Sequence, residues 1–141
     1  MGVRIEPASA TDREAAVALW HAAGLTRPWN EPGADFDLAL SNPTSTILLA
    51  REESAVVGSV MVGFDGHRGW VYYLAADPQL LGQGVGRALM RAAEHWLVGL
   101  GCPRIRLMMR TDNRAARGFY EAIGYDDQAV ITLGRTLDRT A

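Results

Sequence analysis

A short glycine-rich run, residues 81–86, is the part of the sequence best suited to hold a ligand. An apolar, aromatic stretch precedes it at 70–75, and a helical pattern follows it at 87–93. A strand, a glycine-rich turn and a helix start form an anion site in that order. Glycine lets the backbone approach a ligand closely, and the first helical N–H groups have no partner within the helix. The run therefore predicts a phosphate or pyrophosphate ligand.

The spacing of the glycines excludes two common phosphate-binding loops. A dinucleotide fingerprint needs Gly-x-Gly-x-x-Gly, but its third glycine position falls on Arg87 when counted from Gly82 and on Leu89 when counted from Gly84. A nucleoside-triphosphate loop needs Gly-Lys-Ser/Thr. The chain contains no lysine, because all 14 basic residues are arginine. The same absence excludes a Schiff-base mechanism.

Residues 113–125 carry a second group of side chains with useful chemistry. The pattern predicts a helix over 113–123 that Gly124 closes, and Asn113 is of a type that caps helix starts well. This helix contains one phenol, Tyr120, which fits an amphipathic core position as well as a catalytic one. The pattern by itself leaves both interpretations open.

The elements that must position these segments alternate in type and predict a mixed α/β chain around one central sheet. Strands are predicted at 3–7, 46–51, 56–64, 70–75, 104–109 and 130–133. Helices are predicted from the cap Thr11 to Gly24, around 36–42, and at 84–100 and 113–123. Glu14 stands at the capping-box spacing from Thr11. The apolar face of the long helix is predicted to be Leu89, Ala92, Ala93, Trp96 and Leu100.

Length and composition limit the class of protein. A chain of 141 residues with 48% apolar residues predicts one domain, 1–141, with a core of its own. The formal net charge of −2 argues against a nucleic-acid partner. The single cysteine, Cys102, excludes an internal disulfide and a cysteine-based zinc cluster, and no metal site is expected. The most apolar window, 56–64, is too short to cross a membrane, so a cytoplasmic protein is expected.

Both segments resemble the GNAT N-acetyltransferase superfamily. Its acetyl-CoA loop reads Arg/Gln-x-x-Gly-x-Gly/Ala; Gly84 and Gly86 match the glycines, while Leu81 stands at the Arg/Gln position. Residues 113–125 match a later signature of Asn, Ala three on, Tyr seven on and a closing Gly-aromatic pair. The resemblance implies a central, mostly antiparallel mixed sheet of about six to seven strands flanked by about four helices. Within the superfamily, residues 27–30 and 63–74 resemble the small bacterial YpeA-type acetyltransferases.

The resemblance implies that acetyl-CoA is the cofactor and that a neutral amine attacks its thioester. This reaction needs donors for an oxyanion, a proton for the CoA thiolate and removal of a proton from the amine. The resemblance assigns the first to a backbone N–H around Leu74 and the second to Tyr120. Arg114 and Arg117 either reach CoA phosphates or are simply solvated. The implied acetyl-CoA contacts are Leu74, Ala75, Ala76, Gly82, Gln83, Gly84, Val85, Gly86, Arg87 and Asn113.

No residue declares itself as the general base. Asp65 and His67 lie in the turn before the strand at 70–75, and Glu31 and Asp77 are further candidates, each of which also fits an ordinary turn or capping role. Trp29 and Glu31 are expected near the acceptor, although a tryptophan there also suits a lid over the core.

These expectations amount to an acetyl-CoA-dependent N-acetyltransferase acting on a small-molecule or peptide amine. The alternatives are a protein N-terminal acetyltransferase of the ribosomal-protein alanine type and a non-catalytic acyl-CoA-binding domain. A homodimer is left open, and neither nucleic acid nor membrane is expected as a partner.

Overall fold

The computed structural model describes residues 2–138, which fall into two compact units that meet in sequence between Met108 and Met109. The first unit contains a five-stranded sheet and three helices, and the second contains one helix. The strands are β1 (Val3–Pro7), β2 (Ser45–Glu52), β3 (Ala55–Phe64), β4 (Gly69–Ala76) and β5 (Ile105–Leu107). The helices are α1 (Arg13–Ala22), α2 (Pro32–Ser41), α3 (Val85–Gly99) and α4 (Arg114–Ala122), with short 3-10 turns η1 (Ala10–Asp12) and η2 (Pro78–Leu80).

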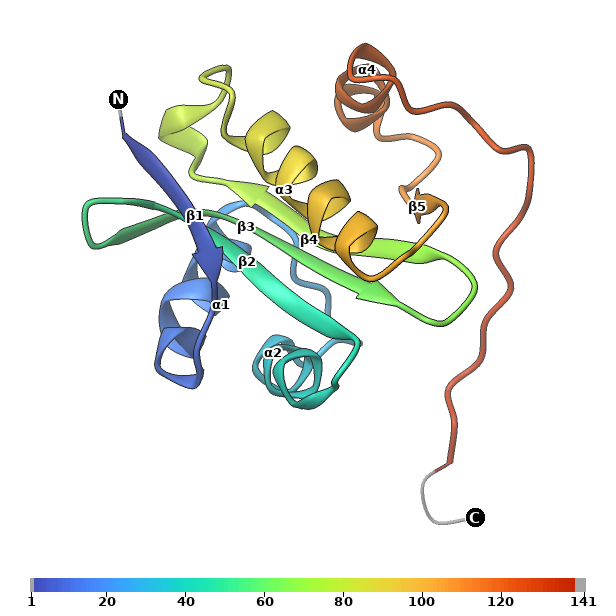
Figure 1. The fold of residues 1–141 in the computed structure, drawn as a ribbon, viewed down its shortest axis with the longest axis horizontal. Helices are drawn as coiled ribbons and strands as arrows, with labels where there is room; N and C mark the ends of the chain where they lie inside the picture. Colours follow the sequence, from blue (N-terminus) through green and yellow to red (C-terminus); the bar gives the residue numbers. More distant parts are fainter. Residues whose placement is uncertain (1, 139–141) are drawn as a thin grey trace. The chain divides into compact units, whose positions relative to one another are not determined.

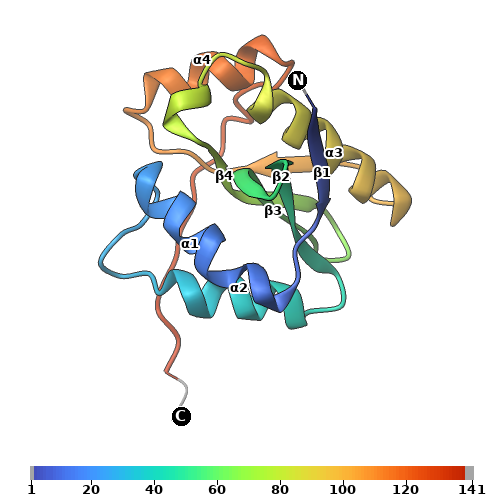
Figure 2. The same ribbon diagram turned by 90° about the vertical axis from the view of Figure 1, so that its left-hand side faces the viewer.

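The sheet of the first unit has the order β1-β2-β3-β4-β5. Neighbouring strands from β1 to β4 are antiparallel, and β5 runs parallel to β4. Figures 1 and 2 show α1 and α2 on one face of this sheet and α3 on the other. The predicted fold class, a mostly antiparallel mixed sheet with four helices, is confirmed, and the described residues form five strands rather than six or seven.

Two separate apolar layers hold the helices to the sheet. On the α1/α2 face the core cluster is Ala16, Leu19, Trp20, Phe36, Ala39, Ile47, Leu49 and Ala75. On the other face α3 buries Val85, Leu89, Met90, Ala93 and Leu97. This differs from the predicted face, because Leu97 rather than Trp96 or Leu100 turns to the sheet; Leu100 is 44% exposed. The layer under α3 fixes this helix against β3 and β4.

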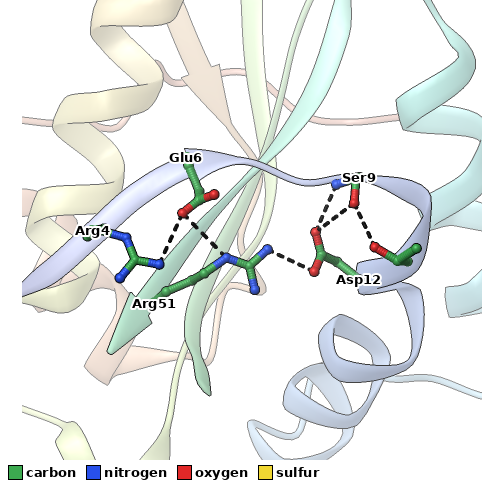
Figure 3. A network of polar contacts seen from close by, with 6 residues as sticks. Arg4, Glu6, Ser9, Asp12 and Arg51 are labelled. Atoms are coloured by element: carbon green, nitrogen blue, oxygen red, sulfur yellow. Dashed lines mark hydrogen bonds and ion pairs between the residues drawn. The ribbon is translucent and has the colours of Figure 1, made fainter. Parts of the chain in front are cut away.

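The start of α1 is capped differently from the prediction. The capping box is formed by Ser9 and Asp12 around η1, with the Ser9 N–H donating to Asp12 Oδ2 at 2.8 Å, and not by Thr11 and Glu14. Asp12 Oδ1 also pairs with Arg51 Nη2 at 2.8 Å, and Arg51 reaches Glu6 as well (Figure 3). The box therefore ties the first helix to β2 through a long-range ion pair.

The second unit consists of α4 and an extended segment. Asn113 Oδ1 accepts from the Ala116 N–H at 3.0 Å and caps α4, and Gly124 follows its end at a φ of 99°. The strand predicted at 130–133 is wrong, because these residues form no regular structure and Ile131 and Leu133 are 84% and 86% exposed. Strand-favouring residues form a strand only where another strand pairs with them.

No helix of the described residues is long and apolar enough to cross a membrane.

Candidate functional site

The glycine-rich loop joins η2 to the start of α3, as the sequence predicts. Gly82 and Gly84 have φ values of 82° and 85°, which L side chains rarely adopt. The first bond within α3 runs from the Ala88 N–H to the Gly84 carbonyl at 3.0 Å. The N–H groups of the preceding helical residues therefore have no acceptor within the helix. No acidic side chain lies in this first turn, so the positive end of the helix is not neutralised from within.

The predicted loop residues divide according to how their backbone is used. Gln83 uses its N–H inside the turn, donating to the Leu80 carbonyl at 3.2 Å. Val85, the first residue of α3, is buried against the sheet, and Arg87 is exposed in the same turn. Leu81 is 69% exposed, which agrees with a loop that offers backbone rather than side-chain donors. The donor set at the start of α3, from Gly84 to Arg87, fits a pyrophosphate.

A β-bulge interrupts β4 just before this loop. Ser59 pairs with Ala75 and Met61 with Tyr72, so Tyr73 and Leu74 together lie opposite the one residue between Ser59 and Met61. The pairing of β4 with β5 ends earlier, at Val71. Neither neighbouring strand therefore has a register partner for Tyr73 or Leu74. Their peptide therefore lies in the middle of the sheet without a register partner on either neighbouring strand.

The bulge is held by a chain of polar contacts on the α1/α2 face. Trp20 Nε1 donates to Ser59 Oγ at 2.8 Å, and Ser59 Oγ donates to the Tyr73 carbonyl at 2.8 Å. The Tyr73 ring stacks on Trp20 with centroids 3.9 Å apart, and its hydroxyl donates to Asp35 Oδ2 at 2.7 Å. Burial first, and the Asp35 carboxylate second, raise the pKa of Tyr73 above its usual value. The phenol therefore stays protonated and keeps donating to Asp35.

The sequence did not single out these contacts. Ser59 interrupts an otherwise apolar run, and a buried hydroxyl needs a partner, so it was the one available signal. Its partners lie 39 and 14 residues away in the chain, at Trp20 and Tyr73. Asp35 gave no signal at all, because a carboxylate in the first turn of a helix is common.

Asp65, one of the predicted acceptor-side residues, organises the turn between β3 and β4. Asp65 Oδ1 accepts from the His67 and Arg68 N–H groups at 2.8 and 2.7 Å, and Oδ2 accepts from Trp70 Nε1 at 3.2 Å. The Arg68 and His67 N–H groups lower the pKa of Asp65. Asp65 is thus a fully engaged carboxylate, and His67 is exposed beside it. Tyr72, 44% exposed on β4, is the aromatic side chain next along the strand.

The other predicted acceptor-side residues are dispersed along the first unit. Trp29 is 69% exposed in the segment between α1 and α2. Glu31 stands at the N-cap position of α2 without a side-chain capping bond. Asp77 caps η2, because its Oδ1 accepts from the Gln79 N–H at 2.9 Å. Ala75 lies in the α1/α2 core, and Leu74 and Ala76 are half-buried on β4.

In the second unit, Tyr120 lies in an aromatic cluster. Its ring meets Phe119 and Tyr125 edge-on, with centroids 5.0 and 5.9 Å away, and burial raises the pKa of Tyr120 to about 12. Arg117 pairs with Glu121 and Asp127 at 3.3 and 3.6 Å, so its charge is already matched. Arg114 is exposed in the first turn of α4.

Other chemistries find little support in the described part of the chain. Residues 2–138 contain no group of three or more metal-ligating side chains. Cys102 is half-buried, and its thiol donates to the Arg104 carbonyl at 3.1 Å, which is a structural role.

The family model and the most similar sequences both match acetyltransferases. The family model described as "Acetyltransferase (GNAT) family" matches residues 13–125. The chain is 44% identical to an acetyltransferase of Pectobacterium atrosepticum over 126 residues, which cover 89% of each protein. It is 42% identical to an acetyltransferase of Yersinia enterocolitica over 127 residues, which cover 90% of each.

Solved structures share the fold at low identity. The aminoglycoside N-acetyltransferase AAC(6')-Iy in complex with CoA has a TM-score of 0.83 at 16% identity, covering 96% of this chain and 95% of that one. Glucosamine-6-phosphate N-acetyltransferase from Arabidopsis thaliana has a TM-score of 0.76 at 17% identity, covering 98% of this chain and 100% of that one.

Proposed function

Because the chain belongs to the GNAT acetyltransferase family, we propose that it moves an acetyl group from acetyl-CoA to a primary amine by direct attack in a ternary complex. The observation that carries this proposal is the sequence of bulged strand, glycine loop and helix start, because it puts two kinds of backbone donor on neighbouring segments of the first unit. The family match runs through both compact units, which supports treating 1–141 as one domain.

Acetyl-CoA supplies an activated acyl thioester and a thiolate leaving group. The N–H groups at the start of α3 hold its pyrophosphate. Gly84 has no side chain to block the approach to them, and glycine adopts its φ of 85° without strain. Leu74, in the bulge of β4, offers its N–H to the acetyl carbonyl oxygen. A fixed N–H donor stabilises the negative charge that develops on this oxygen during attack.

Tyr120 is the proposed acid. Its pKa of about 12 keeps the phenol protonated throughout the physiological range. It can therefore hydrogen-bond to a departing thiolate, whose reference pKa is about 8.5, and pass its proton to it, and the proton that the amine loses then converts the phenolate back to the phenol. The assignment rests on the family signature at 113–125 and on this protonation state.

A cationic amine is the proposed acceptor class. Glu31 and Asp35 put two carboxylates at and just after the start of α2, and Asp35 is joined directly to Tyr73 of the bulge. Aminoglycoside acetyltransferases among the solved structures of this fold make a small-molecule acceptor a reasonable first choice. A peptide α-amine remains the alternative, because a water molecule can remove a proton from an amine with a pKa of about 8.

Two measurements test this proposal. Acetyl-CoA should raise the melting temperature of the purified protein while NAD and ATP do not, and no shift at saturating acetyl-CoA would contradict the ligand. Free-thiol release should then be followed with panels of aminoglycosides, polyamines, amino acids and peptides. Tyr120→Phe should keep CoA affinity and lower turnover on the best acceptor roughly 100-fold. Unchanged turnover in this variant would remove Tyr120 as the acid.

A further inference from the structure

Ser59 is a buried polar side chain in the middle of an apolar strand. Its exposed fraction is 0%, and it is the one polar residue among the fully buried side chains described. Trp20 Nε1 can only donate, so Ser59 Oγ accepts that bond and keeps its own proton for the Tyr73 carbonyl. The two bonds, both 2.8 Å, fix the direction of the hydroxyl completely.

The residue that receives this bond has an unusual backbone. Tyr73 has a φ of 52°, one of three non-glycine residues with a positive φ among the described residues. This conformation is strained for a side chain with a Cβ, so it persists only where contacts impose it. Three contacts meet at Tyr73: Ser59 on its carbonyl, Trp20 on its ring and Asp35 on its hydroxyl.

The position of the Tyr73 carbonyl determines where the next N–H points. A trans peptide is planar, with its C=O and N–H in opposite directions, and the described residues contain no cis peptide. Because the Tyr73 carbonyl points to Ser59, the Leu74 N–H points away from Ser59 and from β3. On that side the β4–β5 pairing has already ended at Val71. The Ser59 hydroxyl thus determines the direction of the Leu74 N–H.

We propose that Ser59, supported by Trp20, is a positioning residue that aims the Leu74 N–H at the acetyl carbonyl oxygen. The inference rests on the proposed acetyl transfer and adds to it the part of the fold that orients the donor. An N–H stabilises developing charge only when its geometry is set in advance, and a displacement of about 1 Å can cost a factor of about 100 in rate. Of the three contacts at Tyr73, the one from Ser59 is made to the carbonyl of the very peptide that carries the Leu74 N–H.

The test compares Ser59→Ala with Val62→Ala, a matched loss of buried side chain on the same strand away from the bulge. Val62 is 0% exposed and pairs with Val71. Ser59→Ala should lower kcat by roughly 10- to 100-fold, below the loss of about 100- to 1,000-fold for complete removal of such a donor, with the KM for acetyl-CoA changed less than threefold. Val62→Ala should lower the melting temperature but leave kcat within about twofold.

A spectroscopic measurement separates a change in the orientation of the Leu74 N–H from a loss of protein stability. Acetyl-CoA labelled with ¹³C at the carbonyl should show a downfield shift when bound to the wild-type protein without acceptor, because a hydrogen bond polarises the C=O. This shift should fall in Ser59→Ala and remain in Val62→Ala. Trp20→Phe keeps an aromatic ring at this position but removes the N–H donor together with part of the indole, so it should give an intermediate loss if Ser59→Ala is too unstable to study.

The outcomes distinguish the two proposals. If the wild-type protein releases no thiol with any amine and does not bind acetyl-CoA, the proposed function fails. If the wild-type protein is active and Ser59→Ala retains both its kcat and the bound carbonyl shift, the positioning role is wrong. An equal loss of kcat in Val62→Ala at the same folded fraction would also overturn it, since the effect would then be general destabilisation.

Discussion

The two faces of the central sheet use different means to hold the same strands. Under α3 the contact is purely apolar, and the helix lies so close that a Cβ at Gly58 would be 2.7 Å from Val85 Cγ1 and 2.8 Å from Leu89 Cδ1. Under α1 and α2 a line of hydrogen bonds, Trp20–Ser59–Tyr73–Asp35, runs through an otherwise apolar core. Close packing fixes how near an element lies, whereas directional bonds fix how a peptide is rotated.

The division matches the proposed chemistry. The α3 face must hold the N-terminus of α3 in a fixed position. Gly58 of β3 is sufficient for that, because it lets Val85 and Leu89 pack directly on the strand. The α1/α2 face must keep one peptide turned away from its neighbours, which shape alone does not enforce. The predictions below test whether the two faces really depend on these different features.

The largest effect is expected from filling the close contact under α3. Gly58→Val adds three carbons where even a Cβ does not fit, so it should destabilise the protein by about 3 kcal/mol in urea unfolding. Gly99→Ala is the matched control, since a Cβ there meets nothing within 4 Å, and it should be neutral or slightly stabilising. Equal tolerance at both positions would mean that α3 is not held by close approach.

A smaller loss of stability is expected from the polar line. Ser59→Ala leaves Trp20 Nε1 and the Tyr73 carbonyl without their partner, which should cost about 2 kcal/mol in the same assay. Ser54→Ala, in the exposed turn between β2 and β3, should stay within about 0.5 kcal/mol. A Ser59→Ala protein as stable as wild type would show that the bulge does not need its hydrogen bond.

The loop before α3 should respond to backbone rather than side-chain changes. Gly84→Ala meets open space but must hold a φ of 85°, which should cost about 1 kcal/mol and weaken CoA binding about tenfold by calorimetry. Leu81→Ala removes a side chain that is 69% exposed and should leave CoA affinity unchanged. The reverse order of effects would mean that the loop binds through its side chains.

The smallest effect is expected from the ion pair between Asp12 and Arg51, which belongs to neither of the two layers. Burial disfavours the Asp12 anion, but Arg51 and the Ser9 N–H outweigh it and lower the pKa of Asp12 below its ordinary 3.8. A lowered pKa in the folded state gives stability that is present above pH 3.8 and disappears as pH falls through the folded value. Asp12→Asn should therefore cost roughly 1 kcal/mol at pH 7.

The pH comparison supplies its own control. Urea unfolding of wild type and Asp12→Asn should give a difference at pH 7 that shrinks on acidification below pH 3.8. A difference that is constant across this range would assign the effect to the capping geometry of η1 instead of the charge.

Local chemistry predicted some parts of this molecule well. The positive φ of Gly82 and Gly84 and the cap at Asn113 follow from residue type and near neighbours. The polar line could not be predicted, because it joins residues that only the fold brings together. Tyr73 is a clear case: tyrosine does not signal a positive φ, and the contacts that impose it come from α1, α2 and β3.

The same reasoning explains the wrong predictions. Thr11 and Glu14 have the right spacing for a capping box, but Ser9 and Asp12 have it too, and the contact of Asp12 with Arg51 favours the second pair. Residues 130–133 have strand-forming side chains, yet pairing decides whether a strand forms, and no sequence pattern supplies the partner.

The extra residue in β4 limits which insertions and deletions the gene can tolerate. Because Tyr73 and Leu74 occupy the span that one step normally takes, Ala75 reaches the α1/α2 core only by virtue of this insertion. Losing one codon between 72 and 74 would turn every later side chain of the strand to the opposite face, and it would move the start of the glycine loop with them. The length of this segment is therefore constrained, and a scan of single-residue deletions should find it among the least tolerant stretches of the chain.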